Sequence, residues 1–492
     1  MRSLSRRSRP GSRPIRISAC VALLALALGA SPGDAARVDD LPVSAATYLG
    51  GALDDAAGGA AVAADGTLLV AARLPGHDPG GVASTDLLGG GDGALTRLDA
   101  SGRQVLQTVR LGDALVDLDL AADGRVAVAA QGLGLVLLAA DLGTVAWHDP
   151  LPDAVRVATG GDGTALSVAV LTAGRTVRVL DGAGGLRGTR SFGDSVVADV
   201  TVAPDGQRVV VTGFNNRTTS GGTPVQVPFV RAFDPTLTTQ LWRAYDWTAD
   251  QVAAQDNSLA DCRGVRVAFG ADDFLYFAGR TDGGNTTFRF DPLVIDRRLP
   301  SDELVSYDPF SNTAGISGSF AITVFGRFEP ATGDVLKLQL LLARLSSGNG
   351  NTVVPAAIMA DASGRVFVGG RAFASIQERD QQRIAGQPVG PYQSGEAFLL
   401  AVDPDFLARE VWTVFTAPGG TQNTSVVGVA ERAGRVAWSI DVANDTARLL
   451  TVDALQPTRD VGTSAYLATR LWTLFGDGFE SGDLGAWSAS VP

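Results

Sequence analysis

Residues 201–214 show the pattern of apolar and polar positions that recurs through the chain. An apolar run ends at Ala203-Pro204, a turn follows at Asp205-Gly206, and a β-branched run leaves it at residues 209–212. Asp-Gly between two such runs is a strong hairpin signal, because a type I′ turn needs positive φ at both central residues. The stretch therefore predicts a β-hairpin with a type I′ turn.

The same pair of apolar runs occurs seven times along the chain. Its turns are centred on Asp65-Gly66, Asp123-Gly124, Asp162-Gly163, Asp205-Gly206, Asp272-Asp273, Ser363-Gly364 and Ala433-Gly434. The two shortest spacings between these turns are about 39 and about 43 residues, and a four-stranded propeller blade repeats every 40 to 45 residues or so. The spacing therefore favours a repeat of four strands.

A second hairpin follows in most units, where an apolar strand ends in Asp or Glu before a small turn. Its turns begin at Asp99, Asp181, Asp234, Glu329 and Asp403, and several of the strands that follow carry a tryptophan, namely Trp147, Trp242 and Trp412. Four strands in each of seven units predict an all-β fold, a seven-bladed β-propeller of four-stranded antiparallel blades. The alternatives are an array of β-sandwiches and a β-solenoid, although a solenoid has a shorter and more constant period.

Closure of the ring has a candidate strand at the N-terminal end. Residues 43–49 read like the outer strand of a blade, yet no partner strands precede them. They are expected to complete the last blade and so remove an open sheet edge. Residues 465–474 compete for the same outer position. The propeller domain is expected to span residues 43–474.

The first 36 residues have the features of a cleaved export signal. A segment with six arginines precedes a short apolar core at residues 17–28, and small residues follow. The apolar core is too short to span a bilayer, so no transmembrane segment is expected. Loss of six arginines and one aspartate shifts the net charge from −12 to about −17. We therefore expect a monomer that is secreted, periplasmic or at the cell surface. Such an acidic chain is a poor candidate for binding nucleic acid. Only Cys262 remains after cleavage, which excludes an intrachain disulfide.

One family resemblance rests on the first unit. Residues 47–51 (TYLGG), 62–66 (VAADG) and 93–102 (GALTRLDASG) resemble the SBBP-type bacterial β-propeller repeat. The resemblance implies an extracytoplasmic propeller, and most members have no assigned activity. Residues 475–483 (FGDGFESGD), followed by Trp487, are similar to a short tail of exported bacterial proteins. Residues 475–492 are therefore expected to form a flexible C-terminal tail.

Long insertions are expected on one face of the propeller. In an antiparallel blade, the loop after the second strand and the loop after the fourth strand share a face, and the tight turns share the other. The insertions after second strands are residues 74–91, 215–223, 281–317 and 372–394, and the long loop after a fourth strand is residues 247–261. Loops of this length in a compact domain are usually functional or disordered.

Within these loops, aromatic and polar residues form the candidate binding site. The candidate ligand-binding residues are Trp247, Phe288, Arg289, Phe290, Asp291, Tyr307 and Tyr392. Such a surface suits a glycan, a cell-envelope component or a protein partner. The alternative is that these aromatic residues pack the loops onto the propeller.

Familiar catalytic motifs are missing from the sequence. The histidines are His77 and His148, and neither has a recognisable partner serine. The sequence also lacks the G-x-S-x-G motif of a nucleophilic serine. No catalytic residue, zinc cluster or cofactor motif is expected, and calcium at Gly91-Asp92-Gly93 or residues 477–483 is a weaker possibility. The sequence therefore favours a non-catalytic binding or scaffold protein. The alternative is a hydrolase, lyase or quinone-type oxidoreductase that uses Asp, Glu and Arg residues in the same loops.

Overall fold

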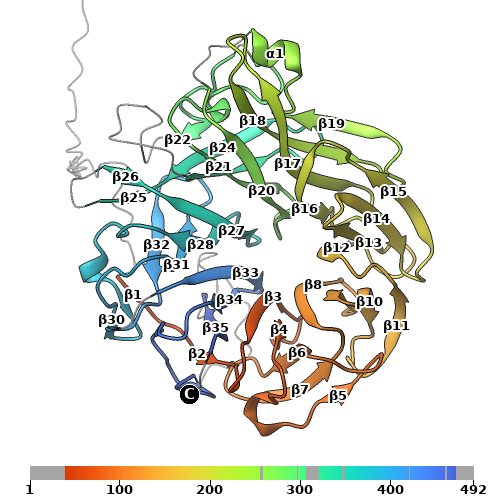
Figure 1. Cartoon of the computed structure of the whole chain (residues 1–492), viewed down its shortest axis with the longest axis vertical. Coiled ribbons are helices and arrows are strands. Elements are labelled where there is room, and N and C mark those ends of the chain that lie inside the picture. The colour runs from red at the N-terminus through yellow and green to blue at the C-terminus, as the bar shows by residue number, and fades with distance from the viewer. Residues whose placement is uncertain are drawn as a thin grey trace, which may run out of the picture.

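The computed structural model describes residues 39–254, 259–295, 297–305, 308, 321–345, 349–419, 422–459 and 462–472. Its fold is all-β and propeller-like, with many four-stranded antiparallel sheets standing around a common centre (Figure 1). All seven predicted hairpins form antiparallel strand pairs. None of the helices in the described part is long and apolar enough to cross a membrane.

Among the described residues, five four-stranded and two five-stranded sheets surround the centre, and we number them sheet 1 to sheet 7 in chain order. Sheet 1 contains β3 (Ala56–Val62), β4 (Leu68–Arg73), β6 (Gly93–Leu98), β7 (Val105–Arg110) and the short β5 (Thr85–Asp86). Sheet 2 contains β8 (Ala114–Leu120), β9 (Val126–Gln131), β10 (Gly134–Leu138) and β11 (Val145–Asp149). Sheet 3 contains β12 (Ala154–Gly160), β13 (Ser167–Thr172), β14 (Thr176–Asp181) and β15 (Leu186–Ser191).

The remaining sheets follow the same order from the inner strand outward. Sheet 4 contains β16 (Val196–Val202), β17 (Val209–Thr218), β18 (Pro224–Phe233) and β19 (Gln240–Ala244). Sheet 5 contains β20 (Cys262–Phe269), β21 (Leu275–Thr281), β23 (Ile322–Phe328), β24 (Val335–Leu341) and the short β22 (Leu304–Val305). Sheet 6 contains β27 (Val353–Ala360), β28 (Val366–Ala372), β31 (Glu396–Val402) and β32 (Arg409–Val414). Sheet 7 contains β33 (Thr424–Arg432), β34 (Arg435–Val442), β35 (Ser464–Leu471) and β2 (Ala45–Tyr48).

Short elements decorate the connections between these strands. The strands are β1 (Asp40–Leu41), β25 (Ala343–Arg344), β26 (Gly350–Asn351), β29 (Arg383–Ile384) and β30 (Gln387–Pro388). The helices are α1 (Ala249–Ala253), η1 (Pro79–Gly81), η2 (Thr287–Arg289) and η3 (Arg379–Gln381). Strands β5 and β22 add to the outer edges of sheets 1 and 5 in parallel, which covers those edges.

Strand β2 occupies the outer position of sheet 7, far from its sheet partners in sequence. It pairs antiparallel with β35, where Tyr48 lies opposite Tyr466, and the two rings meet edge to face at 5.2 Å. The Leu449 N–H donates to Tyr48 Oη at 2.8 Å. The competing segment at residues 465–474 forms β35, the third strand of the same sheet, so both segments join it in different positions.

Seven apolar clusters account for most of the core, and each lies between neighbouring sheets. The cluster between sheets 7 and 1 joins Val62 and Leu68 with Ala437 and Leu467. Polar contacts reinforce this junction, because Ser439 Oγ donates to Gly58 O at 2.6 Å. Sheets 1 and 7 therefore pack together although they lie at opposite ends of the described chain.

The turn type predicted at Asp205-Gly206 is wrong. Gly206 has a positive φ of 71°, but Asp205 does not, and the Gly206 N–H donates to Ala203 O at 2.8 Å. The β-turn therefore spans residues 203–206, and only the glycine after its central pair needs positive φ. At Ala433-Gly434 both residues have positive φ (51° and 78°), so the two-residue type I′ geometry occurs there.

We call the face with the longer connections the loop face and the opposite one the turn face. One predicted insertion, residues 215–223, is shorter than expected, because β17 runs to Thr218 and β18 begins at Pro224, which leaves a turn of five residues. Another long connection, between β34 and β35, joins the second and third strands of sheet 7 and was not predicted. Its sequence, residues 443–463, follows a hairpin that gives no hint of the length before the next strand.

Candidate functional site

The innermost strand of each sheet contains a β-bulge near its start. The pairing register shifts there in β3, β8, β12, β16, β20, β27 and β33. A bulge re-aims the side chain that follows it, so the same position in each strand faces its neighbours in the same way. This position is Asp117 in β8, Arg156 in β12, Asp199 in β16, Arg266 in β20, Ala357 in β27 and Gly428 in β33.

Four successive inner strands thus carry charges of alternating sign. We call Asp117, Arg156, Asp199 and Arg266 the charged quartet. In the other three inner strands the bulge holds small residues, namely Ala357, Gly428 and the pair Gly58-Gly59. The small residues permit close approach, since a Cβ on Gly428 would lie 2.9 Å from the backbone nitrogen of Ala60.

Side chains of the charged quartet bind the backbone of the next inner strand. Asp117 Oδ2 accepts the Val157 N–H at 3.0 Å, and Asp199 Oδ2 accepts the Val267 N–H at 3.0 Å. Arg266 Nε donates to Ala356 O at 2.6 Å. Arg156 Nε lies 3.7 Å from Asp199 Oδ1. Backbone groups freed by the bulges thereby find partners, which buried polar groups require.

Burial shifts the pKa values of residues in and near the charged quartet. Desolvation raises the pKa of Asp117 and of Asp199, against the opposing effect of the nearby arginines. Desolvation also lowers the pKa of Arg266 to about 10, and Arg156 lowers it further. Two residues after Asp117 in β8, burial raises the pKa of Asp119 to about 6. It does so although Asp119 Oδ2 accepts hydrogen bonds from the Thr159 N–H at 2.6 Å and from Thr159 Oγ1 at 3.0 Å.

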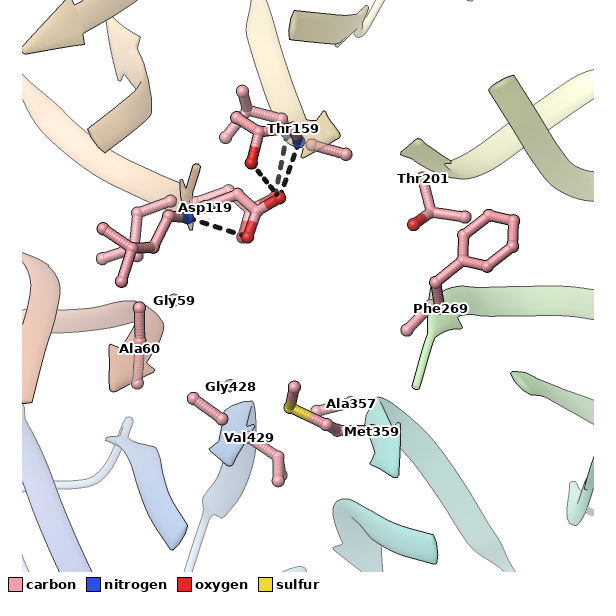
Figure 2. A pocket seen from close by; sticks show the side chains of 18 of the residues that line it. Gly59, Ala60, Asp119, Thr159, Thr201, Phe269, Ala357, Met359, Gly428 and Val429 are labelled. Atoms are coloured by element: carbon pink, nitrogen blue, oxygen red, sulfur yellow. Dashed lines mark hydrogen bonds between the residues drawn. The ribbon is translucent and has the colours of Figure 1, made fainter. Parts of the chain in front are cut away.

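These residues line a cavity of about 470 Å³ at the centre of the molecule. Figure 2 shows Asp119 and Thr159 on one side, with Ala357, Met359, Gly428 and Val429 across from them. One arc of the wall is therefore polar and charged, and the other combines small and apolar residues with Glu431 and Arg432. The lining includes Gly161, Pro204 and Ala271 at the ends of inner strands, so the cavity lies toward the turn face.

The sequence-predicted binding residues lie elsewhere, in the loops. Trp247 and Phe288 are buried, with 2% and 0% of their surface exposed. Trp247 meets the ring of Phe290 at 5.9 Å, and Phe288 meets Tyr245 at 5.1 Å. These contacts agree with the alternative that the aromatic residues pack the loops onto the propeller.

The other predicted residues have mixed environments. Asp291 is buried, accepts the N–H groups of Leu293 and Val294 at 2.7 Å, and pairs with Arg297. Arg289 is half-buried, and desolvation lowers its pKa. Tyr392 is exposed at 36% on another loop, and Tyr307 lies outside the described residues. Whether any of these residues binds a ligand stays a prediction.

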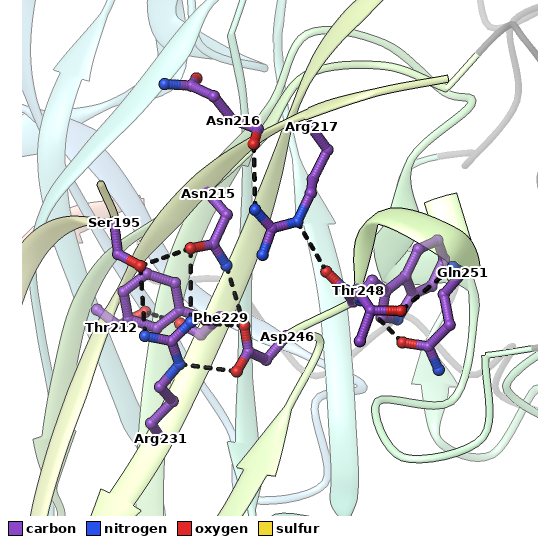
Figure 3. Close-up of polar contacts among 11 residues, drawn as sticks. Ser195, Thr212, Asn215, Asn216, Arg217, Phe229, Arg231, Asp246, Thr248 and Gln251 are labelled. Carbon is purple, nitrogen blue, oxygen red and sulfur yellow. Dashed lines mark hydrogen bonds and ion pairs between the residues drawn. The ribbon is translucent and has the colours of Figure 1, made fainter. Parts of the chain in front are cut away.

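A polar network fixes the loop that holds Trp247. Arg231 contacts both oxygens of Asp246 at 2.7 Å, Asn215 Nδ2 donates to Asp246 Oδ1 at 2.9 Å, and Ser195 Oγ donates to Asn215 Oδ1 at 2.6 Å (Figure 3). Arg217 Nε donates to Trp247 O at 3.1 Å. Helix α1 starts in a capping box between Thr248 and Gln251. The loop is thus tied to strands β17 and β18 at several points.

Buried ion pairs fix two more loops. Arg379 binds both oxygens of Glu396 at 2.5 and 2.6 Å, and Glu396 is fully buried. Arg409 Nη2 donates to Asp308 Oδ2 at 2.9 Å, and Arg344 reaches Asp308 Oδ1 at 3.0 Å. These pairs could not be predicted from the sequence, because the partners lie 17 to 101 positions apart.

The described residues offer little for metal or thiol chemistry. They contain no group of three His, Cys, Asp or Glu side chains that could hold a metal ion. Asp92, a calcium candidate from the sequence, pairs with Arg73 at 3.0 Å, and residues 477–483 lie outside the described part. Cys262 is buried, and burial raises the pKa of its thiol. A raised pKa makes a thiol a poor nucleophile.

Sequence reasoning missed the charged quartet. The signal was available, since a single charged residue interrupts an apolar run in VDL (116–118), VRV (155–157), ADV (198–200) and VRV (265–267). In each run, apolar and polar positions alternate as they do in a strand. A charged residue at a polar position fits this alternation and does not by itself indicate a site. Only alignment of the repeats on their bulges shows that the four charges share one position.

Comparison with known proteins identifies no family for this chain. No family model matches the sequence, and no curated protein matches it. Among solved structures, one titled "Structure of U3-55K" is similar, with a TM-score of 0.44 and 10% identity over 84% of this chain and 95% of that chain. This likeness concerns the arrangement of the backbone alone.

Proposed function

We propose that the chain is an exported seven-bladed β-propeller, closed by β2, that serves as a non-catalytic binding or scaffold protein. Packing of sheet 1 against sheet 7, and the pairing of β2 with β35, support a closed ring. Secretion, or a place in the periplasm or at the cell surface, rests on the basic and apolar pattern of residues 1–36. The resemblance to SBBP repeats supports the same location.

The observation that carries the binding role is the construction of the loop face. The long connections contain short helices and strands, buried aromatic residues and buried ion pairs such as Arg379–Glu396. Loops that need only to link strands are short, as the turns on the opposite face are. Fixed loops on a rigid scaffold are a common basis for recognition. We expect the partner to be a glycan, a cell-envelope component or a protein.

The enzymatic alternative has less support on this face. A catalytic acid or nucleophile there would need a carboxylate directed at a substrate. Asp246, Asp308 and Glu396 are instead buried and held by arginines within the loops. These pairs explain the residues as loop anchors, so we favour binding over catalysis.

Exposed aromatic residues on one loop give the test. Phe373 and Tyr392 flank the connection between β28 and β31, and they are 39% and 36% exposed. The purified chain would be applied to an array of bacterial cell-wall polysaccharides, and the affinity of each bound glycan measured by biolayer interferometry. The Phe373→Ala/Tyr392→Ala variant is expected to bind at least about tenfold more weakly, as loss of an interface anchor does.

Leu186→Ala provides the matched control, since Leu186 is a similarly exposed apolar residue on the outer strand β15. It should bind like the wild type. Equal affinity of the double variant and the wild type would show that this loop is not the contact surface. Binding to no glycan on the array would reject the glycan and leave a protein or another envelope component as the partner.

A further inference from the structure

The central cavity lies toward the turn face, away from the loops assigned to binding above. The hydrogen bonds of the charged quartet to neighbouring strands explain only part of its charged wall. Three inner strands place Ala357, Gly428 and Gly58-Gly59 at the bulge and still pack against their neighbours. The repeat thus provides its own control, because a charged residue at this position is not required to join two sheets.

Three of the four charged side chains also retain unused hydrogen-bonding capacity. Among the described residues, Asp117 uses only Oδ2, which leaves Oδ1 as a free acceptor. Arg156 donates through Nη1 to Val155 O, and Arg266 through Nε and Nη1 to Ala356 O and Val265 O. Within the same described part, neither Nη2 atom has a hydrogen-bond partner. Each guanidinium can therefore still donate to a carboxylate.

The quartet carries two positive and two negative charges. A simple anion or cation would meet repulsion from half of the group, whereas a small molecule with both charges would meet partners for each. On the opposite wall, where Glu431 and Arg432 also line the cavity, Ala60, Ala357, Met359 and Val429 offer an apolar surface for the rest of such a molecule. A volume of about 470 Å³ falls within the usual range of ligand pockets, roughly 300 to 1,000 Å³.

We propose that the central cavity binds a small zwitterion, an α-amino acid with an apolar side chain. The carboxylate lies against Arg156 and Arg266, the ammonium group against Asp117, and the side chain against the apolar wall. This site is separate from the loop face, so failure of either proposal leaves the other standing.

Isothermal titration of the purified chain with leucine tests the proposal. Leucinamide keeps the ammonium group and lacks the carboxylate, and 4-methylpentanoate keeps the carboxylate and lacks the ammonium group. Leucine is expected to bind at least about tenfold more tightly than either analogue, because each analogue leaves one charged partner unmatched. No heat of binding with leucine up to about 10 mM would reject the site. Equal binding of 4-methylpentanoate would reject the zwitterion.

Variants connect the binding to the quartet. Arg156→Met and Asp117→Asn should each weaken leucine binding at least about tenfold. Asn at 117 keeps an acceptor for the Val157 N–H, so this variant is expected to fold even if Arg156→Met does not. Arg175→Met and Asp194→Asn, exposed positions on the loop face, serve as matched controls and should bind leucine normally. Normal binding by the folded Asp117→Asn variant would contradict the assignment.

Discussion

The indole of Trp242, on the outer strand of sheet 4, lies against Gly333 in a turn of sheet 5. Trp242 Nε1 donates to Pro330 O in the same turn at 2.8 Å. Gly333 has a φ of +81°, and a Cβ at this position would lie 2.6 Å from the indole ring. Trp147 of sheet 2 meets Gly184 of sheet 3 in the same way, with a Cβ 3.0 Å from the ring. The tryptophan of one sheet thus packs against a turn of the next sheet, and this contact requires glycine in that turn.

Gly333→Ala is therefore expected to lower the free energy of unfolding by about 2 to 4 kcal/mol, from left-handed strain together with the clash with Trp242. Gly222→Ala is the matched control, because Gly222 has a φ of +79° and nothing within 4 Å of the added Cβ. That control should lose only the strain energy, about 1 to 2 kcal/mol. Urea unfolding of both variants gives the comparison. Equal losses would mean that the indole moves aside without cost.

Three other turns solve the same packing problem with their own side chains. Next to the outer strands β7, β15 and β24, which lack a tryptophan, the equivalent turn residue is Leu142, Leu237 or Phe406, each with positive φ and each buried. Phe406 stacks on Phe325 of the preceding sheet at 5.6 Å. The turn of sheet 1 differs, because it keeps Gly102 although β2 has no tryptophan, and an added Cβ would lie 2.9 Å from Thr469.

Arg379→Met is expected to destabilise the protein by about 3 to 5 kcal/mol at neutral pH, because it leaves the buried Glu396 carboxylate without its cation. The double variant Arg379→Met/Glu396→Gln should recover part of this loss, since the remaining amide is neutral. Burial already raises the pKa of Glu396, so acid should protonate it in the single variant and reduce the deficit. Urea unfolding at about pH 5 and pH 7.5 measures this. A single variant no less stable than the double would argue against an uncompensated charge.

The fold was largely predictable because its information is local. Turn residues such as Asp123-Gly124 between alternating apolar runs define the seven inner hairpins, and an Asp or Glu before the turn defines five of the outer ones. The turn type at Asp205-Gly206 was mispredicted because dipeptide preference does not fix how many residues close the hairpin. A strand was expected at residues 465–474, close to the start of β35, but at the outer edge of the last blade, so residues 443–463 were not recognised as an insertion between second and third strands.

The central site was less predictable because it depends on juxtaposition across the ring. Asp117 and Arg266 lie far apart in sequence, and they approach one cavity only when seven inner strands converge. The surroundings of the loop aromatics could not be predicted for a related reason. Composition cannot show that Phe288 packs among Tyr245, Phe277 and Phe328, where it fills a gap between sheets 4 and 5.

Tyr48→Phe is expected to weaken the junction between β2 and the rest of sheet 7. The change removes the Oη atom that accepts the Leu449 N–H and leaves that buried donor unsatisfied, at a cost of about 1 to 3 kcal/mol. Tyr392→Phe is the control, since Tyr392 is 36% exposed, and it should change stability by less than about 0.5 kcal/mol. Thermal unfolding followed by circular dichroism compares them. Similar midpoints for the two variants would show that a water replaces the lost oxygen.

The Asp119 carboxyl should make stability depend on pH in an unusual direction. Its folded pKa of about 6 lies above the ordinary value of 3.8, so the folded state holds the proton more tightly than the unfolded chain. Stability from this group is present below about pH 4 and falls as pH rises through 6, by up to about 3 kcal/mol. Asp119→Asn removes this contribution, so the variant should gain on the wild type between pH 4.5 and pH 7.5 or so. Urea unfolding across that range tests it, with the exposed Asp194→Asn as a control that runs parallel to the wild type. If the free energy of unfolding changed with pH in the same way in the wild type and in Asp119→Asn, Asp119 would titrate outside this range. Its hydrogen bonds to Thr159 would then outweigh the effect of burial.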